Sequence, residues 1–137
     1  MNIALCYSMQ FAEKAKETEE WFRAQGHTAF PSSSNEKYIG LSDEEKEKLK
    51  LVHKYEQDAI SKHWNVIQNC DAVLVLNDDK QGIPGYIGGN SFLEMGFAHV
   101  LKKPIYLLYP IPNIPYYKTE IIAMKPHILH GDLSKML

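Results

Sequence analysis

The sequence predicts a single α/β domain over residues 1–137, with a doubly wound, flavodoxin- or Rossmann-like fold of about five parallel strands in the order 2-1-3-4-5 and helices on both faces. Two observations lead to this prediction. Short apolar runs alternate along the chain with longer segments of helical periodicity, which is the pattern of β-α-β units. One of these runs, 71–77, is apolar on both alternating sets of residues, as a parallel strand covered on both faces must be.

Five short segments are expected to form the strands of this sheet. The first and the third are continuous apolar runs, which are typical of buried strands. The second is stopped by Pro31, and the fourth begins at Pro104. The expected strands are residues 2–7, 28–30, 71–77, 104–109 and 127–129.

Four segments between these strands have the apolar spacing of helices. The clearest start is at Ser42, because Glu45 three residues later completes a capping box. The helix that begins there is expected to continue to about Asn69, with Glu56 and His63 on the face that also carries its apolar residues. The expected helices are residues 11–25, 42–69, 91–101 and 118–124.

Composition and charge argue against several classes of function. A net charge of −2 leaves no basic surface for a nucleic-acid polymer. Neither a signal peptide nor an apolar run of membrane-spanning length is visible, so we expect a cytoplasmic protein without a membrane partner. Cys6 and Cys70 are expected to be buried free thiols, and the six histidines lack the spacing of a metal site.

Polar side chains gather at one edge of the predicted sheet. In doubly wound folds, ligands bind beyond the carboxyl ends of the strands, where the strand order reverses between the first and third strands. Tyr7 and Ser8 follow the first strand, and Asn77 and Asp78 follow the third. We therefore expect Ser8, Asn77 and Asp78 to contact a ligand in a crevice at this edge.

A glycine-rich turn leads into the third expected helix and is the most informative part of the chain. Free backbone N–H groups and the helix dipole favour an anion at such a helix start. Glu94 is expected in the first turn of the helix, where its carboxylate would face a bound sugar or phosphate. The residues expected to hold the ligand are Gly88, Gly89, Asn90 and Ser91.

These segments together resemble the nucleoside 2-deoxyribosyltransferase superfamily, which includes deoxynucleoside 5′-monophosphate N-glycosidases. The resemblance rests on the strand that ends at Tyr7-Ser8, on residues 69–75 and 103–108, and on the turn with Glu94-Met95-Gly96-Phe97-Ala98. It spans nearly the whole chain, and the Glu-X-Gly-X-Ala element is its most specific part. It implies an enzyme that cleaves or exchanges the N-glycosidic bond of a nucleoside or nucleoside 5′-monophosphate without a metal or other cofactor.

The resemblance also implies roles for individual residues. Glu94 stands where the family has its nucleophile for the sugar anomeric carbon, and Tyr7 stands where it has a tyrosine close to that nucleophile and the sugar. The turn at 88–91 stands where relatives hold a sugar hydroxyl or a 5′-phosphate. Family members form homodimers in which a C-terminal segment can complete the neighbouring site, which makes Glu120 the candidate contribution from a second subunit.

The chain departs from the family pattern at two positions. The family carries a catalytic aspartate eight residues before the aspartate that corresponds to Asp71, and here that position is His63. A histidine can still protonate a leaving base, because its ordinary pKa is near 6.5. It cannot accept hydrogen bonds as a carboxylate does, so altered acid–base function and loss of activity both stay open. Gly88 stands where the transferases have an aspartate, which favours a pocket that tolerates phosphate or is otherwise atypical.

Other interpretations remain open from the sequence alone. Glu94 could stabilise the helix dipole, His63 could be a core histidine bonded to a backbone carbonyl or to Glu56, and Asn77 and Asp78 could cap a loop. The alternative function is a non-catalytic nucleotide-binding or sensing module on the same fold. A phosphoribohydrolase of the lysine-decarboxylase-like family shares the Gly-Gly…Glu turn, but the short chain and the missing Gly-Thr pair argue against it.

Overall fold

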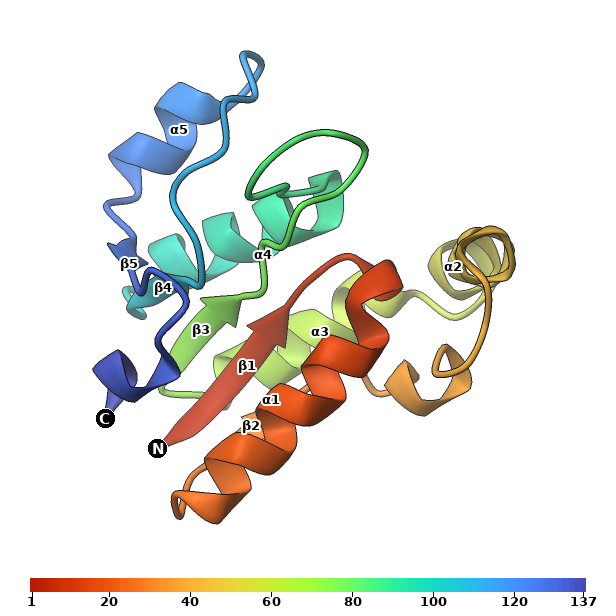
Figure 1. Cartoon of the computed structure of the whole chain (residues 1–137), viewed down its shortest axis with the longest axis horizontal. Helices are drawn as coiled ribbons and strands as arrows, with labels where there is room; N and C mark the ends of the chain where they lie inside the picture. Colours follow the sequence, from red (N-terminus) through yellow and green to blue (C-terminus); the bar gives the residue numbers. More distant parts are fainter.

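The computed structural model describes residues 1–137, apart from the side chain of Glu56. Its centre is one sheet of five parallel strands in the order β2-β1-β3-β4-β5 (Figure 1). The predicted strand number, order and direction are confirmed. The strands are β1 (Asn2–Cys6), β2 (Thr28–Phe30), β3 (Ala72–Val75), β4 (Ile105–Leu107) and β5 (His127–Ile128).

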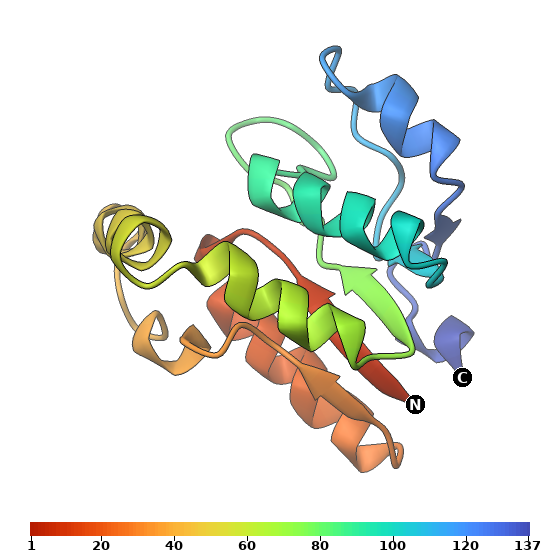
Figure 2. The same cartoon turned by 180° about the vertical axis from the view of Figure 1, so that it is seen from behind.

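Helices cover both faces of the sheet, as predicted. One face is covered by α1, while α3 and α4 lie side by side on the other, which Figure 2 shows from behind. Short 3₁₀ helices precede α1, interrupt the loop after β2 and end the chain. The helices are α1 (Ala12–Ala24), α2 (Asp43–Glu56), α3 (Ala59–Gln68), α4 (Gly89–Val100), α5 (Lys118–Ala123), η1 (Met9–Phe11), η2 (Asn35–Lys37) and η3 (Leu133–Met136).

The two faces of the sheet bury two separate apolar clusters. Successive side chains of a strand point to opposite faces, so Leu5 packs in the cluster with Phe22 of α1, while Cys6 packs in the cluster with Met95 of α4. Cys6 and Cys70 are buried free thiols, which confirms that prediction. No helix among the described residues has the length and apolar character that crossing a membrane requires.

The prediction of one long helix over 42–69 is wrong. The helix starts at Ser42 with the predicted capping box, but it ends at Glu56, and α3 begins after Asp58. Asp58 adopts a left-handed conformation (φ 47°), and its carboxylate accepts a hydrogen bond from the Ser61 backbone N–H at 3.2 Å. Aspartate tolerates this conformation and caps a new helix with its side chain, so the helix breaks without glycine or proline.

The break gives α2 a direction of its own. Figure 1 shows α2 beyond the end of the sheet, whereas α3 packs along the sheet. Lys46, only 4% exposed, holds α2 in place through an ion pair with Glu13 (2.7 Å) and a hydrogen bond to the Gln10 carbonyl (3.2 Å). As a result, α2 forms a wall across from the start of α4 at the carboxyl edge of the sheet.

Candidate active site

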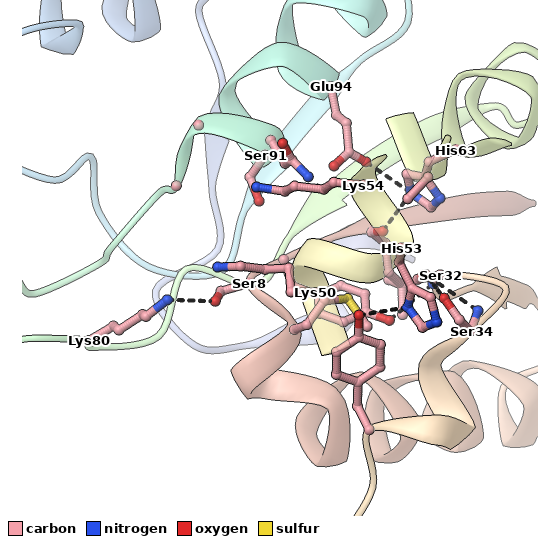
Figure 3. Close-up of a pocket in the computed structure, with 18 of the residues that line it drawn as sticks. Ser8, Ser32, Ser34, Lys50, His53, Lys54, His63, Lys80, Ser91 and Glu94 are labelled. Carbon is pink, nitrogen blue, oxygen red and sulfur yellow. Dashed lines mark hydrogen bonds and ion pairs between the residues drawn. The ribbon is translucent and has the colours of Figure 1, made fainter. Parts of the chain in front are cut away.

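A crevice lies at the carboxyl edge of the sheet, where the strand order predicts a binding site (Figure 3). We call it the central crevice. Its floor is the end of β1, and its walls come from α2, α4, the loop after β2 and the segment before α4. The residues that line it include Tyr7, Ser8, Ser32, Ser34, Tyr38, Lys50, His53, Lys54, His63, Lys80, Gly88, Gly89, Asn90, Ser91 and Glu94.

Glu94 is almost enclosed where α3, α4 and β1 meet. Its side chain is 12% exposed, and its Oε2 lies 3.2 Å from Nε2 of His63. The Cys6 thiol sulfur, at the end of β1, lies within 4.8 Å of the same carboxyl group. Three elements therefore fix the position of one carboxyl group that borders the central crevice.

The expectation that Glu94 lies in the first turn of its helix is wrong. The helix begins at Gly89 rather than at Ser91, because the glycine turn itself is helical, so Glu94 is the sixth residue of α4. Burial raises the pKa of Glu94 to about 8, and the Cys6 thiol only partly offsets this effect. An acid that served only to stabilise the helix dipole would be ionised, whereas this one is held largely protonated at neutral pH.

His63 faces Glu94 and the backbone of β1. Its Nε2–H donates to the Leu5 carbonyl oxygen at 2.8 Å, and its Nδ1 is enclosed without a hydrogen-bond partner among the described residues. Burial lowers the pKa of His63, so the ring is neutral near pH 7. This geometry agrees with the backbone-bonded histidine considered above, and it places the ring where it can position Glu94. The side chain of Glu56 lies outside the described part of the structure.

The glycine turn forms the start of α4 next to the crevice. Gly88 is the N-cap residue and provides no side-chain cap, so the first N–H groups of the helix lack that partner. Apart from its chain neighbours and the nearby backbone of its own helix, nothing lies within 4 Å of the place that a Cβ on Gly89 would occupy. Ser91, 3% exposed, lines the crevice one turn before Glu94. The turn thus presents open backbone donors beside Glu94.

Three lysines extend this region into a positively charged wall. Lys50 and Lys54 reach the crevice from α2, and Lys80 reaches it from the loop after β3, with its Nζ donating to Ser8 Oγ at 2.9 Å. Only Lys50 has a carboxylate partner among the described side chains, namely Glu47 at 2.7 Å. Burial, followed by repulsion from Lys50, lowers the pKa values of Lys54 and Lys80. The wall is therefore electrostatically suited to an anion.

Tyr7 lines the crevice, but its hydroxyl group points toward the loop after β2. It donates to Oδ1 of Asn35 at 2.6 Å and accepts from the Ser32 backbone N–H at 3.0 Å. No hydrogen bond joins Tyr7 to Glu94 among the described residues. In this conformation Tyr7 shapes the floor of the crevice and anchors the neighbouring loop.

Asn77 and Asp78 lie outside the central crevice. Asn77 is fully buried, and its amide joins two loops: Nδ2 donates to the Tyr109 carbonyl at 2.8 Å, and Oδ1 accepts from the Tyr109 N–H at 2.9 Å. Asp78 borders a separate surface cavity with Pro84 and Tyr109. These contacts agree with the loop-capping interpretation, and ligand contact at the two positions stays a prediction without support from this geometry.

Replacing Asn77 by Ala is therefore expected to destabilise the protein by about 2 to 4 kcal/mol, because two partly buried backbone groups of Tyr109 lose their partners. Urea unfolding measures this change. Asn113→Ala, at an exposed position near the same cavity, is the control and should alter stability little. A stable Asn77→Ala protein with weakened ligand binding would instead favour the original assignment.

Glu120 lies on the exposed surface of α5 and does not line the crevice of its own chain. Its contribution to the site of a neighbouring subunit stays a prediction.

Sequence reasoning missed the residues that α2 contributes. Lys54 and His63 are nine residues apart, so a continuous helix would place them on opposite sides, roughly 180° apart, yet both line the crevice. Because the break at Asp58 lets α2 and α3 run in different directions, both side chains can face the crevice. An aspartate directly before the apolar pair Ala59-Ile60 is a helix-start signal that could have revealed the break. Nothing in the sequence around Lys80 indicated that this residue would line the crevice.

The fold and the crevice invite comparison with known proteins. By sequence, no family model and no curated protein matches the chain. By structure, it is similar to a 2-deoxyribosyltransferase of Bacillus psychrosaccharolyticus, with a TM-score of 0.50 and 17% identity over 78% of this chain and 71% of the other. It is also similar to a CMP N-glycosidase of Clostridium botulinum, with a TM-score of 0.51 and 14% identity over 93% of this chain and 84% of the other.

Both neighbours belong to the nucleoside 2-deoxyribosyltransferase superfamily. At such low identity the likeness concerns the fold, including the five-stranded parallel sheet in the order 2-1-3-4-5. The chain therefore shares its fold with these two enzymes.

Proposed function

We propose that the protein cleaves the N-glycosidic bond of a nucleoside 5′-monophosphate, with Glu94 as the nucleophile. The observation that carries the proposal is the placement of Glu94: a carboxyl group enclosed between His63 and Cys6, bordering a crevice, about one and a half turns from the open start of α4. Both structural neighbours are enzymes of nucleoside or nucleotide glycosyl chemistry.

In the proposed reaction, the Glu94 carboxylate attacks the anomeric carbon while the base departs with the bonding electron pair. Positive charge develops on the sugar in such a transition state. This charge stabilises the ionised form of Glu94, which burial otherwise disfavours. Water or a second base then releases the sugar from the glutamyl ester.

The charges around the crevice support a phosphate on the substrate. Lys50, Lys54 and Lys80 carry three positive charges, and Glu47 neutralises one of them. The remaining two match a phosphate monoester, whose charge near pH 7 is about −1.5 to −2. The start of α4 adds backbone donors on the same side. The substrate class proposed is therefore the nucleoside 5′-monophosphate rather than the free nucleoside.

The test is a substrate panel of ribo- and deoxyribonucleosides and their 5′-monophosphates, with released base quantified by liquid chromatography. Each substrate is incubated with and without a second free base, which separates hydrolysis from transfer. We expect base release from at least one 5′-monophosphate and little from the matching nucleoside. Turnover restricted to nucleosides would contradict the phosphate assignment.

Removal of a crevice lysine should weaken this preference selectively. Lys54→Ala is expected to lower kcat/KM for the 5′-monophosphate by about 10- to 100-fold, since a charge-assisted hydrogen bond contributes about 1.5–3 kcal/mol. Turnover of the corresponding nucleoside should barely change. Lys48→Ala, an exposed lysine on the same helix, is the matched control. Equal losses on both substrates would show that Lys54 does not contact phosphate.

A second candidate function is non-catalytic nucleotide binding. It is favoured by the raised pKa of Glu94, which leaves the carboxyl group largely protonated near pH 7, and by His63 in place of a family carboxylate. In that case calorimetry would detect binding of a 5′-monophosphate, while the panel would yield no base from folded protein.

A further inference from the structure

The central crevice contains a second histidine, which the chemistry described so far does not use. His53 lies on α2, is 4% exposed and lines the crevice. The hydroxyl of Tyr38, a residue 1% exposed at the end of η2, lies 2.7 Å from Nδ1 of His53, and the rings meet edge to face with centroids 5.3 Å apart. A buried partner on another element therefore fixes the imidazole.

The contact with Tyr38 determines which nitrogen of His53 is available. Burial raises the pKa of Tyr38 to about 12, so its hydroxyl keeps the proton. It donates to Nδ1 of the neutral ring and accepts from Nδ1–H of the imidazolium, and in both cases Nε2 carries a hydrogen. Nε2 has no partner among the described residues and, unlike Nδ1 of His63, is not enclosed.

His53 and Glu94 come from different walls of the crevice. Figure 3 shows Glu94 on α4 next to His63, and His53 on α2 next to Ser32 and Ser34. Cleavage of a glycosidic bond requires a nucleophile on one side of the anomeric carbon and an acid at the leaving group on the other. His63 cannot serve there in this arrangement, because its Nε2 bonds to Leu5 and its Nδ1 is enclosed.

We propose that His53 is the acid that protonates the leaving base and that Tyr38 is its positioning residue; this rests on the proposed function. As the Glu94 oxygen bonds to the anomeric carbon, the bond from that carbon to the base nitrogen breaks, and its electron pair stays on the base. The base takes the Nε2 proton of the His53 imidazolium. His53 is left neutral, with its Nδ1–H still bonded to Tyr38.

The surroundings of His53 suit this step. Burial, followed by the positive charges of Lys37 and Lys62, lowers the pKa of His53, which makes its imidazolium a stronger acid. A bound phosphate dianion would reduce the positive potential in the crevice and favour uptake of the proton. The proposal thus links proton supply to an occupied phosphate site.

The test compares leaving groups. One substrate is the 5′-monophosphate that wild-type protein cleaves fastest in the panel, and the other is the 4-nitrophenyl glycoside of the same sugar 5-phosphate, whose leaving group departs as a stable anion. We expect His53→Gln to slow the nucleotide by about 100-fold or more and to leave the nitrophenyl substrate nearly unchanged. Tyr38→Phe should show the same selectivity to a smaller degree.

Two controls make the result decisive. His99→Gln changes an exposed histidine at the far end of α4 and should affect neither substrate. Thermal melting establishes that each variant is folded. Equal slowing of both substrates by His53→Gln, or no slowing of the nucleotide, would overturn the acid role while leaving the proposed function intact. A wild-type protein that cleaves neither substrate would overturn both.

Discussion

Glu94→Gln is expected to reduce release of base from a nucleoside 5′-monophosphate by at least about 10³-fold, because the amide keeps the shape of the side chain but cannot form the glycosyl ester. The amide has the same size as the carboxyl group and can keep its contacts with His63 and Cys6, so the crevice should keep its structure. Affinity for the nucleotide, measured by calorimetry, should change little.

The control for this variant lies on the same helix. Asn90→Ala alters a neighbouring crevice residue without touching the nucleophile, so it should affect KM more than kcat. If Glu94→Gln retained turnover within a few-fold of wild type, Glu94 would not be the nucleophile. A loss of both turnover and binding would show instead that the carboxyl group holds the crevice together.

The same substitution is expected to stabilise the folded protein progressively as the pH rises. Burial raises the pKa of Glu94 from 4.5 to about 8. Between these values the unfolded chain has lost the proton that the folded protein keeps, so this group makes wild-type stability fall with pH by roughly 1.4 kcal/mol per unit at most. Glutamine has no such proton.

Urea unfolding of both proteins at several pH values measures this effect. The two proteins should differ least below about pH 4.5, and the advantage of Glu94→Gln should grow to several kcal/mol by about pH 8 and then level off. Glu45→Gln, at the exposed capping box of α2, should show an effect of the opposite sign that develops only below about pH 4.5, because hydrogen bonds to Ser42 lower the folded-state pKa of Glu45. A constant difference between wild type and Glu94→Gln across the range would mean that Glu94 is ionised in the folded protein.

These two expectations belong together. A carboxyl group that is costly to ionise in the folded protein is poorly explained as a surface or helix-dipole acid. Such a group, buried beside a crevice, is typical of functional sites, where residues that serve the reaction lower the stability of the fold. The proposed nucleophile role would account for a carboxyl group at so unfavourable a position.

The sequence alone was sufficient to predict the sheet, because the patterns that indicate its strands lie within short segments of the chain. The apolar run around Val73 and Leu74 and the alternation of strands with helices determine a parallel sheet, and the topology then places the end of β1 beside the start of α4. Glu94 could be selected as a candidate because the glycine turn and the helix adjoin in the chain.

The rest of the site depends on contacts between distant segments. Tyr38 and His53 meet only because the helix ends at Glu56 and α2 turns away from α3, a break produced by one left-handed aspartate. Asn77 was expected to contact a ligand because it follows a strand, but its side chain bonds to Tyr109, which lies 32 residues further along the chain. The pattern of hydrophobic residues does not indicate which distant residues form such contacts.

The central claim is that Glu94 bonds covalently to the sugar, and intact-protein mass spectrometry tests it most directly. A substrate 5′-monophosphate with fluorine at C2 of the sugar slows breakdown of the ester, because fluorine disfavours positive charge at the neighbouring carbon. We predict a mass increase of one fluorinated pentosyl phosphate, located by peptide mapping on Glu94 and absent from Glu94→Gln. Active protein that forms no adduct, or forms one on another residue, would contradict the account.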